Sequence, residues 1–291
     1  MDPEEASRLL AEEYSRMAEA YEAYAVPQNA SLVRRLLDLA AVKPGQGILD
    51  VGCGPGNLAF EVARRVGDGG RAVGVDLAEG MVSLAKTRAA REGLRNVRFE
   101  VMDGRNLSYP RATLDVVASC LGIPSVGHSQ CFAEAHRVLR TGGRFVFCVG
   151  TGGGTGSEVG TAYRDTRERF RPPNPPLDLQ RLLEARQVIQ ATGEPEALRK
   201  PGVTVPRLRG VGFVDVRVIT ESHPAIFRTV DDYLRYQSAW GDNEREWRLM
   251  SHSTREAFRR EFAARVEGFA RPDGFAYTRE VLFCVAAKDG T

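Results

Sequence analysis

Hydrophobic and polar positions follow two alternating periods along the first half of the chain. Short apolar runs of strand length occupy residues 48–52, 72–76, 97–102, 115–119 and 144–149. Apolar residues at the three- and four-residue spacing of amphipathic helices occupy residues 57–66, 79–92 and 129–139. This alternation predicts parallel strands joined by right-handed helical crossovers.

The N-terminal segment has a helical pattern of its own. Over residues 4–25, one face carries apolar and aromatic side chains, namely Leu10, Tyr14, Met17, Tyr21 and Tyr24. Pro27 and Asn29 interrupt the pattern, and we expect a second helix over residues 31–41. Both helices precede the first strand.

The alternation stops between residues 151 and 210. A glycine-rich stretch, 152–156, predicts a hinge, and helices are expected over 162–170 and 177–192. We interpret this segment as an inserted cap. Strands resume at 214–219 and 278–286, and two capping-box-like patterns between them, Thr229-x-x-Asp232 and Ser253-x-x-Glu256, predict two helix starts.

The pattern therefore predicts an α/β fold in four parts. Residues 1–43 form N-terminal lid helices, and residues 44–150 form a ligand-binding core. Residues 151–210 form the cap and substrate region, and residues 211–291 complete the sheet and add further lid helices.

Composition limits the partners. The chain has 291 residues with 40 basic and 38 acidic side chains, a formal net charge of +2, which favours a small substrate over nucleic acid or anionic lipid. No run reaches the roughly 18 apolar residues of a membrane span, and the acidic start differs from a signal peptide, so we expect a cytoplasmic protein. Five cysteines without a C-x-x-C pair favour neither a disulfide framework nor a metal site.

Candidate chemistry lies in the glycine-rich loop after the first strand. The loop reads Asp50-x-Gly52-Cys53-Gly54-Pro55-Gly56, and Asp76 ends the second strand. A carboxylate at that position can accept hydrogen bonds from both hydroxyls of a ribose. The G-x-G-x-G spacing differs from the G-x-G-x-x-G loop that holds a pyrophosphate, which predicts an adenosine-containing ligand without phosphate.

Four motifs in this order resemble the class I S-adenosylmethionine-dependent methyltransferases. They are the glycine loop, residues 74–81, residues 101–104 and residues 138–145. Within that superfamily, the chain is most similar to the ubiquinone/menaquinone-biosynthesis type and related small-molecule methyltransferases. The resemblance implies S-adenosylmethionine as cofactor and a Rossmann-like seven-stranded sheet with its last strand antiparallel and helices on both faces.

The resemblance also implies roles for particular residues. Gly52, Cys53 and Gly54 would lie against the methionine portion of the cofactor, and Asp76 would hold the ribose. Leu77 and Met81 would border the adenine, Asp103 and Gly104 would meet its edge, and Ser119 would be the next contact. A tyrosine of the N-terminal helix, Tyr14, Tyr21 or Tyr24, would donate to the methionine carboxylate. Asp50 either braces the glycine turn or contacts the amino group.

Candidates for acceptor chemistry lie in later segments. His128, in the loop after the fourth strand, is a candidate general base, with a polar lead into the next helix as the alternative. His223, after the sixth strand, is the second candidate base. Tyr233, Tyr236 and Trp240 either line the acceptor site or pack their helix. We interpret Cys120 as an apolar thiol near the cofactor and not as a nucleophile.

These observations predict methyl transfer to a small organic acceptor of biosynthetic or secondary-metabolite type by in-line displacement. No metal, nucleic acid or membrane partner is expected, and lid helices are compatible with a homodimer. One alternative is an RNA or protein methyltransferase, which needs a basic or extended docking surface. A second alternative, a nicotinamide-dependent oxidoreductase, rests only on the general similarity of the βαβ unit.

Overall fold

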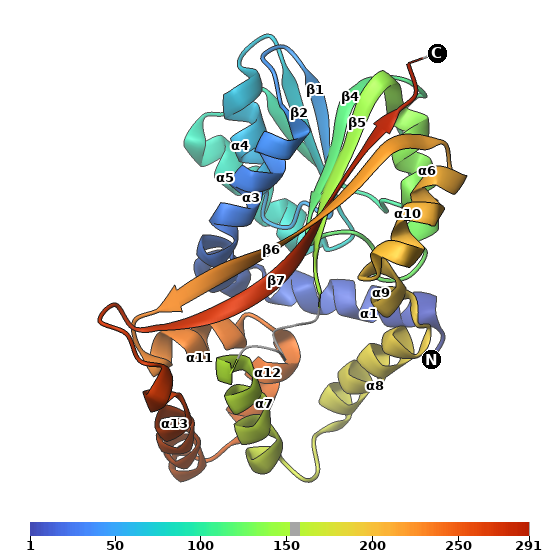
Figure 1. Ribbon diagram of the computed structural model, residues 1–291. Coiled ribbons are helices and arrows are strands. Elements are labelled where there is room, and N and C mark those ends of the chain that lie inside the picture. Colours follow the sequence, from blue (N-terminus) through green and yellow to red (C-terminus); the bar gives the residue numbers. More distant parts are fainter. Residues whose placement is uncertain (152–157, 291) are drawn as a thin grey trace.

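Seven strands form one mixed sheet in the computed structural model, which describes residues 1–151 and 158–290 (Figure 1). The strands are β1 (Gly47–Val51), β2 (Arg71–Asp76), β3 (Val97–Val101), β4 (Leu114–Cys120), β5 (Leu139–Gly150), β6 (Phe213–Phe227) and β7 (Phe275–Lys288). Their order across the sheet is β3-β2-β1-β4-β5-β7-β6, and β7 runs antiparallel to both of its neighbours. The predicted fold class is confirmed.

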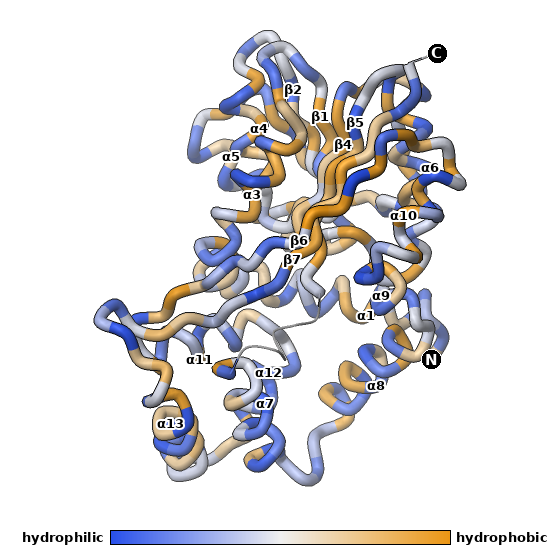
Figure 2. Tube along the Cα trace, viewed as in Figure 1, coloured by the Kyte–Doolittle hydropathy of each residue, from blue (hydrophilic) through white to orange (hydrophobic). Residues whose placement is uncertain are grey.

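Helices cover both faces of this sheet. On one face lie α3 (Val26–Ala40), α4 (Asn57–Val66) and α5 (Glu79–Glu92), and on the other lie α6 (His128–Val138) and α10 (Pro201–Gly210). Successive side chains of β1 alternate between the two cores: Ile48 packs with the first set of helices and Leu49 with the second. Because both faces are buried, the central strands are almost continuously hydrophobic (Figure 2).

The segment between β5 and β6 is helical, as predicted for a cap. It contains α7 (Glu158–Phe170), α8 (Leu177–Ala191), α9 (Glu194–Leu198) and α10. The expected hinge at 152–156 lies outside the described residues, and the four-part division of the chain remains a prediction. None of the helices that the structure describes is both long and apolar enough to cross a membrane.

The N-terminal helices differ from the prediction. After α1 (Pro3–Arg16) and α2 (Ala18–Ala20), a π-helical turn, η1 (Tyr21–Ala25), leads directly into α3. The expected break at Pro27 is wrong because Pro27 occupies the first turn of α3, where a missing N–H costs little. The wider π turn also rotates Tyr24 off the aromatic stripe, leaving it 38% exposed.

The last two strands are longer than predicted and form a ribbon that reaches beyond the rest of the sheet (Figure 1). Pro224 obscured the length of β6, but a proline is tolerated there because β6 is the edge strand. The far end of the ribbon packs on C-terminal helices through an aromatic core that includes Phe227, Tyr233, Phe262 and Phe275.

These helices are α11 (Val230–Ser238), α12 (Gly241–Leu249) and α13 (His252–Val266), followed by the short η3 (Glu267–Phe269). The predicted capping box of Thr229 and Asp232 is confirmed at the start of α11. At α13 the prediction is corrected: Ser251 accepts the capping bond from the amide of Thr254, so the helix begins before Ser253. Helix α12 was not predicted.

A candidate active site at the carboxyl ends of the strands

A cavity of about 310 Å³ opens at the carboxyl ends of β1, β2 and β4. Its wall combines the glycine loop, the loops after those strands, and side chains of α1, η1 and α3. Strand order reverses between β1 and β4, and such switch points are where open α/β sheets bind ligands. Its volume is within the range of about 300–1,000 Å³ for small-molecule sites.

The glycine loop is shaped by two close constraints. Gly52 has φ +67°, and a Cβ there would lie 2.2 Å from the carbonyl oxygen of Gly122, so only glycine lets the loops after β1 and β4 approach. Gly54 has φ +52°, and a Cβ there would meet no atom within 4 Å. Gly54 therefore presents open space and bare backbone to the cavity.

Asp76 lies at the end of β2, beside the glycine loop. Its Oδ2 accepts from the amide of Gly54 at 2.8 Å, and its Oδ1 accepts from the amide of Ala78 at 2.9 Å. Burial raises the pKa of Asp76, against the opposing effect of these amides. Each carboxylate oxygen has a second lone pair, so Asp76 can accept two more hydrogen bonds from a ligand in the cavity.

Asp50 lies beneath the loop and is 2% exposed. Its Oδ2 accepts from the amide of Ala59 at 3.2 Å, which braces the first turn of α4, and the residue also lines the cavity. Burial raises the pKa of Asp50 well above its ordinary value. The bracing role is therefore present, and contact with a ligand amino group remains a prediction.

Three of the four residues predicted to lie near the adenine line the cavity. Leu77, Met81 and Gly104 line the cavity as expected. Asp103 does not, because its carboxylate pairs with Arg105, with Nη2 2.7 Å from Oδ2. Arg105 lines the wall instead and also pairs with Glu4 of α1 at 2.5 Å. Contact between Asp103 and adenine remains a prediction.

At the end of β4, the structure places the wall one residue later than expected. Ser119 is fully buried and lies behind the wall, and its Oγ has no hydrogen-bond partner among the described residues. Cys120 and Leu121 line the cavity, and Leu121 has an unusual φ of +62°. Because side chains alternate along a strand, an offset of one residue exchanges the exposed and buried positions.

Three aromatic side chains from two distant segments form one side of the cavity. Tyr14 and Tyr21 meet edge to face with ring centroids 6.3 Å apart, and Tyr21 and Trp240 do so at 5.7 Å. Tyr24 is absent from this wall, which corrects its expected placement. Tyr233 is completely buried in the aromatic core under the ribbon and so packs its helix.

The two candidate histidines lie outside the cavity wall. The expectation that His128 faces a transferable methyl group is wrong: its fully buried ring contacts Arg207 through Nε2 and lies 3.2 Å from Glu194 through Nδ1. Burial, followed by the charge of Arg207, lowers the pKa of His128. His223 lies within β6 and not after it, 3.3 Å from Glu221, and its role as a base remains a prediction.

Several wall residues were missed by sequence reasoning. Asn29 appeared only as a helix breaker, and Arg105 was not considered although it follows Asp103 by two residues. Further members come from helices whose mutual contacts no local pattern reveals, namely Ser7, Ala11 and Ile189. The sequence predicted that the N-terminal helix acts as a lid but did not single out Ser7 or Ala11.

The wall fits an adenosyl sulfonium in three respects. Gly54 leaves bare backbone and space beside it, and Asp76 retains acceptor capacity for two hydroxyls. Asp50 and Asp76 place two carboxyl groups near the loop, which favours a cationic ligand. The Tyr14, Tyr21 and Trp240 rings line the cavity, and an aromatic face attracts a desolvated cation.

Comparison with known proteins gives the same assignment. The model of a methyltransferase domain matches residues 48–143. Nocamycin O-methyltransferase of Saccharothrix syringae is 33% identical over 72% of this chain and 73% of its own length. Aklanonic acid methyltransferase of Streptomyces sp. is 31% identical over 64% of this chain and 79% of its own length. Ubiquinone/menaquinone-biosynthesis methyltransferases match over shorter stretches.

Solved structures agree on the fold. The YcgJ protein of Bacillus subtilis superposes with a TM-score of 0.54 at 14% identity, covering 88% of this chain and 97% of that one. The predicted family, cofactor and reaction class are confirmed. The chain belongs to the class I S-adenosylmethionine-dependent methyltransferases and transfers the methyl group of that cofactor to a small organic acceptor.

Proposed function

We propose that this enzyme methylates an acidic oxygen of its acceptor, and specifically a carboxylate, to give a methyl ester. Two relatives that share most of their length with this chain support the proposal by their names, one being an O-methyltransferase and the other acting on aklanonic acid. The observation that carries it is the composition of the cavity wall.

Acidic and basic side chains on the described part of that wall are Asp50, Asp76 and Arg105, and this part contains no histidine or lysine. Asp50 braces α4 and Asp76 holds the glycine loop and is assigned to the cofactor, so neither is placed to serve the acceptor as a base. A neutral hydroxyl or amine acceptor needs a group that removes its proton during transfer. A carboxylate is already deprotonated near neutral pH, since such groups have pKa values of about 4. It can therefore attack without a base, which makes it the acceptor class that best suits these residues.

In the proposed reaction, the chain aligns and shields the reactants. S-adenosylmethionine, when bound, supplies a methyl group on a positively charged sulfur. Asp76 and the glycine loop would fix the adenosyl end of the cofactor. Cys120 and Leu121 line the part of the cavity next to the carboxyl end of β4. Leu10 and Ala11 of α1 cover the cavity and exclude water. Alignment of this kind lowers a barrier by roughly 7–11 kcal/mol in favourable cases.

The test uses the chemical stability of the product. The enzyme is incubated with S-adenosylmethionine labelled in the methyl group and with aklanonic acid or small aromatic carboxylic acids. A methyl ester releases volatile labelled methanol under mild alkali, whereas methyl ethers, amines and C-methyl products retain the label. We expect alkali-labile label with the acids and none with the matching primary amides. Alkali-stable label in the products would refute the proposal.

We also propose that the enzyme acts in the cytoplasm, without nucleic acid, and as a homodimer. The near-neutral charge, with 40 basic and 38 acidic residues, supports the proposal that nucleic acid is not a partner. Sedimentation equilibrium tests the third proposal, with a mass twice the 32.0 kDa of the chain expected and a monomer at all concentrations refuting it.

A further inference from the structure

Asn29 lies on the cavity wall and has a charged partner behind it. The residue belongs to the second turn of α3 and is 7% exposed. Arg279 of β7 donates to its Oδ1 from Nη1 at 2.7 Å, and donates from Nη2 to the carbonyl oxygen of Gln28 at 2.5 Å. Two segments 250 residues apart therefore meet at this point of the wall.

This contact fixes the orientation of the Asn29 amide. A guanidinium group has donors and no acceptor, so the atom that faces Arg279 must be the oxygen of the amide. The Nδ2 group then lies on the opposite side of the amide, and no hydrogen bond joins it to another described residue. Asn29 consequently offers its two N–H donors to the site, and Arg279 acts as the residue that positions them.

The charge of Arg279 is not neutralised by a neighbouring carboxylate. No acidic oxygen of the described residues lies within 4.0 Å of its guanidinium, and its buried Nε has no hydrogen-bond partner among them. The ring of Tyr236 is close enough that the charge of Arg279 opposes the rise in its pKa that burial causes. A part-buried guanidinium without a carboxylate partner favours an anion nearby.

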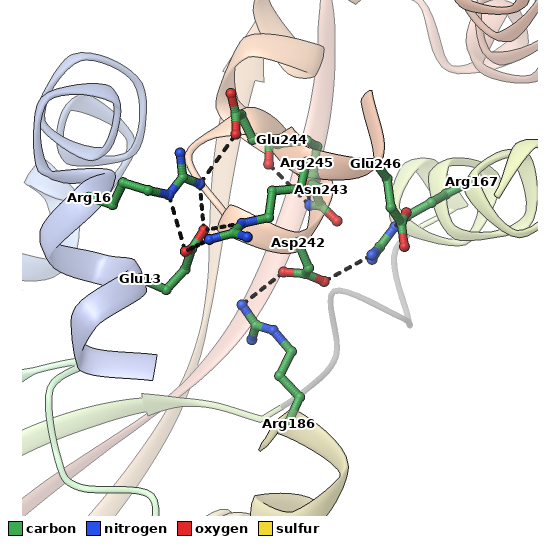
Figure 3. A network of polar contacts seen from close by, with 10 residues as sticks. Glu13, Arg16, Arg167, Arg186, Asp242, Asn243, Glu244, Arg245 and Glu246 are labelled. Carbon is green, nitrogen blue, oxygen red and sulfur yellow. Dashed lines mark hydrogen bonds and ion pairs between the residues drawn. The ribbon is translucent and has the colours of Figure 1, made fainter. Parts of the chain in front are cut away.

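Other interior arginines of the molecule differ in this respect. Arg167 pairs with Asp242 at 2.9 Å and with Glu246 at 2.5 Å, as Figure 3 shows. Arg105, which lines the same cavity, pairs with Asp103 and Glu4. Carboxylates therefore compensate Arg167 and Arg105, whereas Arg279 donates to the Asn29 amide and the Gln28 carbonyl.

We propose that Asn29, oriented and polarised by Arg279, binds a carboxylate in the cavity. The carboxylate has two available sources, the amino-acid end of the cofactor and the acid of the acceptor, and the second source rests on the function proposed above. Either would receive an amide N–H bond and would neutralise the positive charge behind it.

The decisive variant is Asn29→Asp, which is nearly isosteric. Its carboxylate can still accept from Arg279, so the contact between α3 and β7 is preserved, but it presents no donor and adds a negative charge. Arg279→Met is the second variant and removes the positive charge while leaving Asn29 in place. The midpoint of thermal unfolding monitors the fold of both variants.

The first arm of the test measures calorimetric affinities for S-adenosylhomocysteine, which carries an amino-acid carboxylate, and for 5′-methylthioadenosine, which lacks it. If the cofactor is the source of the carboxylate, Asn29→Asp weakens the affinity for S-adenosylhomocysteine by about tenfold or more. The affinity for 5′-methylthioadenosine then stays unchanged. The second arm titrates enzyme saturated with S-adenosylhomocysteine with benzoate, using benzamide as the neutral control. If the acceptor is the source, the variants lose benzoate binding and the first-arm affinities stay at the wild-type level.

The proposal is overturned if both variants match the wild type for S-adenosylhomocysteine and 5′-methylthioadenosine and show no loss of benzoate binding relative to it. It is also overturned if the affinities for both nucleosides fall equally, since the carboxylate is then not the group recognised. These readouts are affinities and need no turnover. Failure of the ester test above would therefore leave this result intact, and the two proposals fail separately.

Discussion

Tyr21 and Tyr24 lie three positions apart in the sequence, but only one of the two side chains lines the cavity. Tyr21 lines the wall beside Trp240, whereas Tyr24 is 38% exposed. We expect Tyr21→Leu to weaken binding of S-adenosylmethionine by about 2- to 30-fold and to weaken S-adenosylhomocysteine less, because only the sulfonium is a cation. Calorimetry with both ligands measures the difference, and Tyr24→Leu is the matched control. Equal losses for both ligands would argue against a cation–π contact.

His128 provides a prediction on pH dependence. Because burial and Arg207 lower its pKa, the unfolded chain binds this proton more tightly than the native protein. Neutral His128 makes its full contribution to the free energy of unfolding above pH 6.5, its ordinary pKa. Below that pH the free energy of unfolding declines, by up to about 1.4 kcal/mol per pH unit. Urea unfolding between pH 7.5 and 5 should show this decline.

The control for this prediction is His128→Gln, which cannot titrate. The variant should lose stability at pH 7.5 but should show a flatter dependence on pH between 6.5 and 5. A slope identical to that of the wild type would show that other groups cause the decline.

Residues whose positions follow from a strand–turn–helix unit could be predicted, whereas residues held by a side chain outside that pattern, near or far in the sequence, could not. Gly52 and Asp76 belong to one strand–turn–helix unit, so their positions follow from local geometry. Asp103 and His128 satisfied the same sequence criteria, but Arg105 and Arg207 hold them away from the wall. The charge of Arg207 comes from a helix 79 residues away, and no pattern near His128 indicates it.

At the scale of elements, the start of α13 gives a matched pair of variants. Ser251 accepts a hydrogen bond from the amide of Thr254 at 3.1 Å, and Ser253 lies inside the helix. We expect Ser251→Ala to lower the free energy of unfolding by about 1 kcal/mol, and Ser253→Ala to change it much less. Chemical denaturation measures both. If Ser253→Ala lowered the free energy of unfolding more than Ser251→Ala, the result would support the capping box at Ser253 that the sequence suggested.

Element types were predictable where periodicity and capping chemistry agree, and boundaries were not. Strands of the central sheet are buried on both faces and stand out as apolar runs, so five of them were located within a few residues. The ribbon of β6 and β7 exceeds its apolar segments because strand pairing stabilises its outer half, where only alternate positions such as Ala225 and Phe227 are buried against the C-terminal helices. The π turn at 21–25 has no sequence signature comparable with a proline or glycine.

At the scale of the molecule, a network of ion pairs joins helices from three parts of the chain (Figure 3). Asp242 of α12 accepts from Arg167 of α7 at 2.9 Å and from Arg186 of α8 at 2.8 Å. Although burial alone raises the pKa of Asp242, the two arginines hold it below its ordinary value. Close by, Glu13 of α1 is 6% exposed and pairs with Arg245 at 2.6 Å.

Removing the Asp242 carboxylate from this network should leave the partly buried guanidinium of Arg186 without a carboxylate partner, and Arg167 with Glu246 alone. We expect Asp242→Ala to lower the free energy of unfolding by about 3–5 kcal/mol. The surface control is Asp178→Ala, whose side chain is 65% exposed, and we expect it to cost at most about 1 kcal/mol. Urea denaturation at pH 7 compares the two. Similar small losses would mean that the network does not hold the cap helices to α12.

Whole-molecule organisation was only partly accessible from sequence. Parallel pairing of the first five strands follows from the alternation of strands and helices, but the order of the strands across the sheet does not. The docking of α12 against α1 and α8 depends on Arg245, whose partners Glu13 and Asp178 lie 232 and 67 positions away, and no local pattern encodes these pairs. For this reason the sequence predicted that helices cover the cavity as a lid, but it did not identify all of the lid residues that line it.

The central claim is that the glycine loop and Asp76 hold the adenosyl cofactor, and calorimetry of Asp76→Ala with S-adenosylhomocysteine tests it most directly. Two ribose hydroxyls bound to a carboxylate are worth enough that affinity should fall by about 100-fold, with the fold shown intact by thermal unfolding. An affinity equal to that of the wild type would contradict the claim.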